Sequence, residues 1–254
     1  SDVGLDKASR LLGQGLRGDP QDSSLLASLQ FLSRSCRHYS AFCALKLWES
    51  QGKALTRLAA SSTDQNVRLH AFKFLEELLR ARSDASKNAH GTFSFAPGSG
   101  HETFSGASEA TGLLLRALTD ESQAVRSVSC SACGNLLSSD YLQVPSAADL
   151  LEMLPKMAST REPSPGVRSA ACYCIGKICS VTGEMAFRQR EACAEIAVKL
   201  MRNGAPSALR ECLCAAEALV RVQASWALAA LAESTLLQLQ VEPPSALLLS
   251  LIAM

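Results

Sequence analysis

Residues 164–178 read SPGVRSAACYCIGKI, and the pattern in this stretch decides the fold. A Val-Arg pair is followed by a small residue three positions after the Arg, and then by apolar residues four and seven positions further on. Counted from the Val, these positions are 0, 4, 8 and 11, so all of them lie on one stripe of an α-helix. A small residue on such a stripe allows a second helix to approach closely. The stretch therefore predicts a helix that packs against other helices.

The same pattern occurs four times along the chain. The four sets are Val67, Arg68, Ala71, Leu75 and Leu78; Val125, Arg126, Ser129, Cys133 and Leu136; Val167, Arg168, Ala171, Ile175 and Ile178; and Val220, Arg221, Ala224, Leu228 and Leu231. Another amphipathic stretch and a short polar turn precede each copy, at residues 51–60, 107–118, 146–157 and 185–201. The Val residues are 58, 42 and 53 positions apart. The shortest interval matches a repeat of two helices, which takes about 40–47 residues, and the longer intervals indicate insertions.

Composition supports a helical, well-packed chain. The 254 residues are 47% hydrophobic and only 5% aromatic, and the apolar residues are mostly Leu and Ala. These side chains favour helices, whereas β-branched and aromatic residues favour sheets. Lys and Arg number 25 against 24 Asp and Glu, a net charge of +1. This balance argues against a strongly basic surface, so we expect no nucleic acid as partner.

The repeated helix resembles the second helix of a HEAT or armadillo repeat, in which Val-Arg-x-x-Ala follows an Asp-containing turn. This resemblance implies a ladder of Asp and Arg along the stack. The candidates are Asp64 and Asp120, before Arg68 and Arg126, while the third and fourth copies lack the Asp. Within residues 162–233, the segments SPGVRSAAC (164–172) and VRVQASWAL (220–228) resemble the HEAT-repeat-containing protein 6 family. That resemblance implies a helical scaffold without a catalytic motif.

We therefore expect an all-α fold, a right-handed α-solenoid of HEAT/armadillo-type two-helix repeats. Residues 1–50 are predicted to form a degenerate or capping repeat, residues 51–82 a helix pair and residues 83–105 an inserted flexible loop. Residues 106–254 are predicted to hold three further units, the last of them truncated or incomplete. Residues 206–218 contain no turn signal, so we expect either an unusually long fourth inner helix or residues missing there. Because the chain begins at Ser1 without Met, we expect it to be a piece of a longer protein.

The ten cysteines are interpreted as packing residues. They lie mostly in apolar, Ala-rich runs, at positions 36, 43, 130, 133, 172, 174, 179, 193, 212 and 214. Cys130 and Cys133 have the spacing of a zinc pair, but such pairs normally sit in turns near a second pair of ligands. Cys133 instead occupies the apolar stripe, and no His lies near it in the sequence. We expect no metal, and free thiols indicate a reducing compartment, cytoplasmic or nuclear.

No motif predicts catalysis. The four histidines, at 38, 70, 90 and 101, pair with no nucleophile or carboxylate at a recognisable spacing. The glycine-rich residues 96–100 lack the Lys-Ser/Thr of a phosphate-binding loop. We expect no enzyme, no catalytic residue and no cofactor. No apolar run reaches the 18 residues of a membrane-spanning helix, so we also expect no membrane insertion.

These observations predict a protein–protein interaction scaffold or adaptor, whose inner helices present a concave surface to a partner protein. From helix phase, the expected partner-binding residues are Arg126, Asn135, Lys177, Arg221 and Trp226. An alternative is a regulatory helical-repeat module or subunit of a larger enzyme such as a kinase. The three Phe of the inserted loop either dock into a partner or cover the neighbouring repeat; they are Phe93, Phe95 and Phe104. The partner's identity and the oligomeric state stay open.

Overall fold

The computed structural model describes residues 10, 13, 23–36, 52, 55–88, 107–140, 144, 146–180 and 187–241. This part of the chain contains helices and no strands, so the all-α prediction is confirmed. The helices are α2 (Ser23–Cys36), α4 (Gln65–Asn88), α5 (Ala107–Ala117), α6 (Gln123–Asp140), α7 (Ala147–Ala158), α8 (Pro165–Cys179), α9 (Phe187–Arg202), α10 (Ala205–Leu213) and α11 (Ala218–Val241). Residues 55–61 are helical as well. The fold class is an α-solenoid built from helical repeats.

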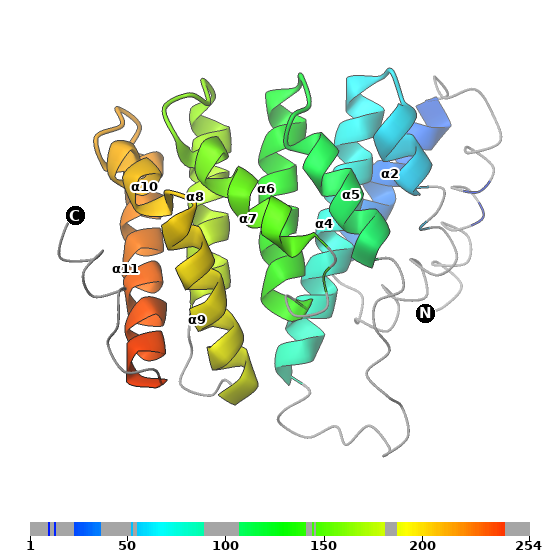
Figure 1. Cartoon of the computed structure of the whole chain (residues 1–254). Coiled ribbons are helices and arrows are strands. Elements are labelled where there is room, and N and C mark those ends of the chain that lie inside the picture. Colours follow the sequence, from blue (N-terminus) through cyan, green and yellow to red (C-terminus); the bar gives the residue numbers. More distant parts are fainter. Residues whose placement is uncertain are drawn as a thin grey trace, which may run out of the picture. The chain divides into compact units, whose positions relative to one another are not determined.

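The chain divides into two compact units, residues 1–153 and 154–254, and the boundary falls within α7. In unit 1, α4 packs between α2 and α6, and α5 lies against α6 (Figure 1). In unit 2, α11 packs along α8 and also contacts α9 and α10 (Figure 1). Within each unit, the helices that carry the Val-Arg pattern therefore pack directly against one another.

The predicted apolar stripe forms the core of both units. Its sixteen positions are at most 5% exposed, with the exception of Leu228, which is half-buried. The small residues Ala71, Ser129, Ala171 and Ala224 are all at most 1% exposed. Because helices pack closest where side chains are small, these residues allow α4 to approach α6 and α8 to approach α11.

Polar residues start the helices of the Val-Arg pattern. The Ser164 hydroxyl accepts a hydrogen bond from the Val167 amide at 3.4 Å, and Pro165 occupies the first turn of α8. Ser122 accepts from the Val125 amide at 3.5 Å in the same way before α6. Side-chain oxygens at these positions satisfy amides that have no partner within the helix. The polar turns predicted between the paired helices therefore act as caps.

The predicted start of the inserted loop is wrong. The inserted loop was expected from residue 83, but α4 continues to Asn88. Ser83 is 1% exposed and its hydroxyl lies 3.2 Å from that of Ser138 on α6, so packing between the two helices extends α4. Residues 89–105, including the three Phe residues, lie outside the described residues.

Residues 206–218 form neither a gap nor part of one long inner helix. Gly204, at φ +83, ends α9, and α10 runs from Ala205 to Leu213 before a turn leads into α11. Glycine adopts this left-handed conformation without steric cost, which explains the break in the helix. The fourth copy therefore has three helices, α9, α10 and α11.

Candidate protein-interaction surface

The arginine of each Val-Arg pair closes the turn that precedes its own helix. In every copy, Nη1 donates to the carbonyl oxygens six and five residues earlier in the chain. The bonds join Arg68 to Ser62 and Thr63 (3.1 and 3.2 Å), Arg126 to Asp120 and Glu121 (2.8 and 3.0 Å), Arg168 to Glu162 and Pro163 (2.8 and 3.4 Å), and Arg221 to Ala215 and Ala216 (2.8 and 2.6 Å). The four arginines thus share one structural role, which we call the turn clamp.

Two of these arginines also bind an acidic residue of the following copy. In unit 1, Arg68 donates from Nε and Nη2 to Asp120 at 3.0 and 3.1 Å, and from Nη2 to Glu121 at 3.1 Å. With the turn clamp, all five N–H groups of Arg68 are used. The hydrogen bond to Asp120 raises the pKa of Arg68 above its ordinary value. In unit 2, Arg168 Nη2 lies 3.3 Å from Glu217 Oε2, so Glu217 serves where the fourth copy lacks Asp.

Two of the five predicted partner-binding residues lie in unit 1, where the structure gives them internal roles. Asn135 is only 4% exposed, and its amide donates to the Glu76 carbonyl of α4 at 3.1 Å. The prediction that Asn135 lies on a partner-binding surface is therefore wrong, because α4 covers the face of α6 that carries it. Arg126 is half-buried and closes its own turn.

Unit 2 carries an exposed aromatic pair. Tyr173 on α8 and Trp226 on α11 stack with ring centroids 5.4 Å apart and an interplanar angle of 29°. Tyr173 is 42% exposed and Trp226 is 38% exposed. The indole of Trp226 lies over Gly176: a Cβ added there would meet ring carbon Cδ2 at 3.0 Å and two other ring carbons closer still. The glycine of α8 therefore makes room for the ring.

Further side chains extend this pair along both helices. Leu219 and Val222, 62% and 61% exposed, lie seven and four residues before Trp226 on the same side of α11. Lys177 follows Tyr173 by four residues on α8 and is half-buried. We name the set Tyr173, Lys177, Leu219, Val222 and Trp226 the aromatic surface.

Arg221 is exposed, but it lies outside the aromatic surface. Five positions separate it from Trp226, which at about 100° per residue places the two side chains about 140° apart around α11. Of the five predicted residues, Lys177 and Trp226 belong to the aromatic surface.

Sequence reasoning missed Tyr173 although a signal was present. The residues five positions after the arginines of the Val-Arg pattern are Lys73, Ser131, Tyr173 and Trp226. Equivalent positions in a repeat share a face, so aligning the copies would have predicted that the two aromatic residues of the last two copies are neighbours. The signal emerges only when the copies are aligned on their arginines.

The cysteines lie in the interior, with one exception. Among the eight that the structure describes, Cys214 is exposed and the others are buried. Burial raises the pKa of the Cys133 thiol well above its ordinary value, and the neighbouring Cys130 raises it further. In the described ranges no group of three or more His, Cys, Asp or Glu is arranged to hold a metal ion. The same part of the chain holds no helix of the length and apolarity that crossing a membrane requires.

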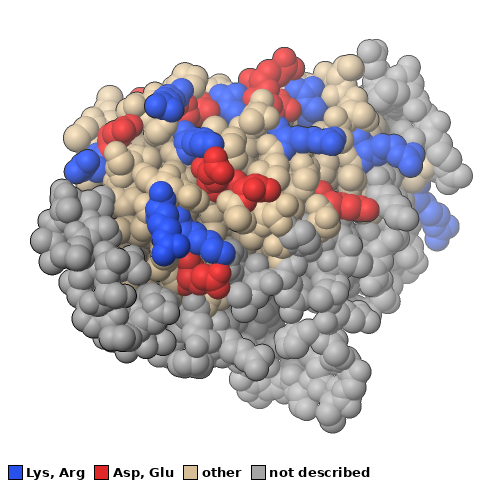
Figure 2. All heavy atoms as spheres, in the orientation of Figure 1, with Lys and Arg blue, Asp and Glu red and all other residues tan. Residues whose placement is uncertain are grey.

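Among the described residues, charges of both signs are interspersed on the face that Figure 2 shows. Among the described residues, some oppositely charged side chains form pairs, such as Lys199 with Glu195 at 2.8 Å. Such exposed pairs contribute little to stability, but they break up any uniform field.

Comparisons with known proteins agree with this architecture. The HEAT repeat family model matches residues 153–182, which include the last part of α7, the turn that follows it and all of α8. An engineered protein solved by the Northeast Structural Genomics Consortium is similar at a TM-score of 0.52 and 17% identity, over 91% of this chain and 97% of that one. A designed armadillo repeat protein is similar at a TM-score of 0.51 and 16% identity, over 89% of this chain and 99% of that one. The structure of computationally designed armadillo repeat proteins for modular peptide recognition is similar at a TM-score of 0.50 and 17% identity, over 89% of this chain and 99% of that one. No curated protein matches the sequence. The likeness supports a fold of the HEAT/armadillo type.

Proposed function

We propose that the chain is a non-catalytic scaffold or adaptor that binds a protein partner through the aromatic surface of unit 2. The observation that carries this proposal is the exposed stack of Tyr173 and Trp226. Aromatic residues make up only 5% of the chain, and two of them lie together on the outside of packed helices. Exposed apolar patches of this kind mark interaction sites.

The chemistry of the surface suits a peptide or helix of a partner. Trp and Tyr bury large areas with few rotatable bonds, so they contribute strongly at the centre of interfaces. The stack and the contact of Trp226 with Gly176 hold the indole in place before any partner arrives. Leu219 and Val222 extend the apolar area, and Lys177 adds a positive charge at one side. The similar, computationally designed armadillo repeat proteins were made for modular peptide recognition, and we extend that kind of activity to this chain.

The proposal includes three further points. The partner is a protein rather than a nucleic acid, because the net charge of the chain is only +1 and charges of both signs are interspersed on the face that Figure 2 shows. The chain acts in a reducing compartment, cytoplasmic or nuclear, because its described thiols are free and mostly buried. Residues 162–233 are related to the HEAT-repeat-containing protein 6 family, as their resemblance suggests.

The test compares partner recovery between matched variants of the full chain. Trp226→Ala and Tyr173→Ala each remove half of the stack, and Leu236→Ala serves as the control. Leu236 is 59% exposed on the same helix, but it lies ten residues beyond Trp226, about 15 Å further along the helix axis. Proteins bound to each immobilised variant are quantified by mass spectrometry, and circular dichroism verifies folding.

We expect a defined set of proteins to be lost at least tenfold with both aromatic variants and retained with Leu236→Ala. Equal recovery with all three variants would show that the aromatic surface binds no partner. Loss with Leu236→Ala as well would extend the binding surface toward the C-terminal end of α11.

A further inference from the structure

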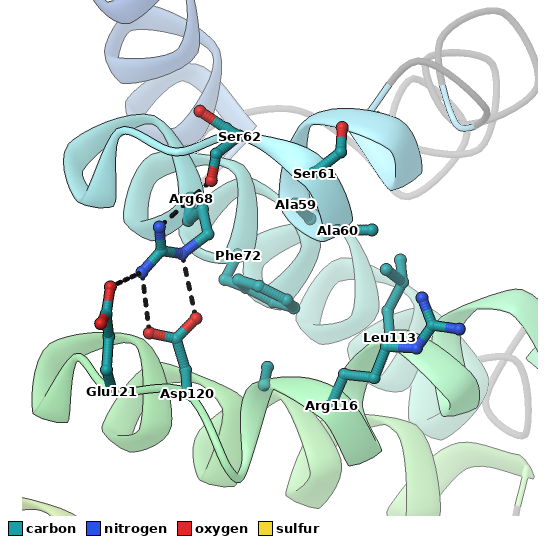
Figure 3. A pocket seen from close by; sticks show the side chains of 11 residues that line it. Ala59, Ala60, Ser61, Ser62, Arg68, Phe72, Leu113, Arg116, Asp120 and Glu121 are labelled. Atoms are coloured by element: carbon teal, nitrogen blue, oxygen red, sulfur yellow. Dashed lines mark hydrogen bonds and ion pairs between the residues drawn. The ribbon is translucent and has the colours of Figure 1, made fainter.

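A cavity of about 360 Å³ lies in unit 1 between helix 55–61 and α5 (Figure 3). Its floor is apolar: Ala59, Phe72, Leu113 and Ala117 line it, and each is at most 7% exposed. A volume at the lower end of about 300–1,000 Å³, the usual range for ligand sites, suits one large side chain better than an extended cofactor.

One wall of the cavity carries an arginine that is already fully hydrogen-bonded. Arg68 lines it, but all five of its N–H groups are taken by Asp120, Glu121 and the two carbonyls of its turn clamp. Figure 3 shows the guanidinium of Arg68 turned toward Asp120 and Glu121. An incoming anion would have to displace a carboxylate from this ion pair, so this wall offers no binding site for an anion.

The opposite wall holds a different arginine. Arg116 lies in the last turn of α5, is exposed and lines the cavity together with Leu113 (Figure 3). Within the described part of the chain, no ion pair or side-chain hydrogen bond engages its guanidinium. A pocket with an apolar floor and polar walls therefore has one available cation at its edge.

We propose that this cavity is a second docking site, which takes an apolar side chain of an acidic partner segment and binds the adjacent carboxylate at Arg116. The proposal rests on the proposed protein-binding function and names the chemistry of one partner. A guanidinium can bind a carboxylate through two parallel hydrogen bonds, which orients the segment as its neighbouring side chain enters the pocket. A phosphate ligand is disfavoured because the cavity has only this one available cation and an apolar floor.

Two capped tetrapeptides are the probes: acetyl-Gly-Phe-Asp-Gly-amide and its neutral counterpart acetyl-Gly-Phe-Asn-Gly-amide. Each is titrated into the full chain, uniformly labelled with ¹⁵N, and amide shifts are followed by NMR. We expect shifts centred on residues 59–62 and 113–121, and at least fivefold weaker binding of the Asn peptide. Arg116→Glu should abolish binding of the Asp peptide. The control, Arg202→Glu, changes an exposed Arg in the last turn of α9 and should leave binding intact.

Equal affinities for the two peptides, or binding that survives Arg116→Glu, would overturn the proposal. So would shifts at the same residues on titration with inorganic phosphate, which would identify a different ligand class. Ala117→Leu provides a second variant that fills the cavity without changing charge and should also block the Asp peptide.

The outcome is separable from that of the proposed function. Trp226→Ala should leave peptide binding at this cavity unchanged. If Arg116→Glu affects neither peptide binding nor partner recovery while Trp226→Ala lowers partner recovery, the cavity proposal alone is wrong. If peptide binding behaves as expected and the aromatic variants change no partner, the aromatic surface alone is wrong.

Discussion

Replacing Arg68 with Met tests the ion pair between the first two Val-Arg copies. Methionine keeps much of the aliphatic length, but it leaves the Asp120 carboxylate without its counter-ion and two turn carbonyls without a donor. The side chains of Arg68 and Asp120 are only 10% and 13% exposed. Breaking a buried pair by removing one partner destabilises by about 3–5 kcal/mol. Because some solvent reaches this pair, we expect the lower end, about 3 kcal/mol.

Arg221→Met is the matched control. This arginine makes the same turn clamp, but it is exposed, and unlike Arg68 it forms no ion pair with any described residue. We expect a loss of about 1 kcal/mol or less, because water replaces the two bonds.

Urea unfolding followed by circular dichroism measures both variants. With a slope of about 2 kcal/mol/M, the midpoint should fall by about 1.5 M for Arg68→Met and by about 0.5 M or less for Arg221→Met. Equal shifts in the two variants would refute the reasoning, since the ion pair would then add nothing beyond the turn clamp.

Three further predictions concern single positions. Gly176→Ala should destabilise unit 2 and shift Trp226 fluorescence to the red, because the new Cβ meets the indole ring; a gain of about 0.5–1 kcal/mol, the ordinary result of Gly→Ala in a helix, would contradict this contact. Burial lowers the pKa of His70 in the folded protein, so below a pH of about 6.5 the unfolded state binds more protons than the folded state. The urea midpoint should therefore fall as the pH drops below about 6.5, and His70→Gln should flatten that dependence. Among the eight described thiols, Cys214 should react first with a thiol reagent in the native protein, and the other seven only after denaturant is added; prompt labelling of a second described thiol would contradict their burial.

The core was predictable because burial follows helix periodicity. One residue pattern identified nearly every buried stripe position in four helices, since a side chain's angle around a helix depends only on its place in the sequence. The same reasoning failed for Asn135, because angle does not reveal depth: whether a face is covered depends on a neighbouring helix 59 residues away. The extension of α4 past Ser83 was missed for the same reason.

The candidate site was only partly predictable. Trp226 and Lys177 were identified from helix phase, but the stack with Tyr173 joins residues more than 50 positions apart and depends on the contact between α8 and α11. The ion pair between Arg168 and Glu217 was not predicted, because the sequence pattern included only Asp at this place, whereas any carboxylate near the arginine can form the pair. The cavity beside Arg116 had no sequence signature, since its lining comes from three separate helices.

The turn clamp has a consequence for the order in which the chain folds. Each clamp joins groups five and six residues apart, whereas the bond from Arg68 to Asp120 spans 52. Short loops close quickly and at little entropic cost, so the clamps can form as soon as their helices nucleate. The long-range pairs must wait until neighbouring repeats meet. Mutations at a clamp should therefore slow folding, whereas loss of the Asp120 carboxylate should chiefly accelerate unfolding.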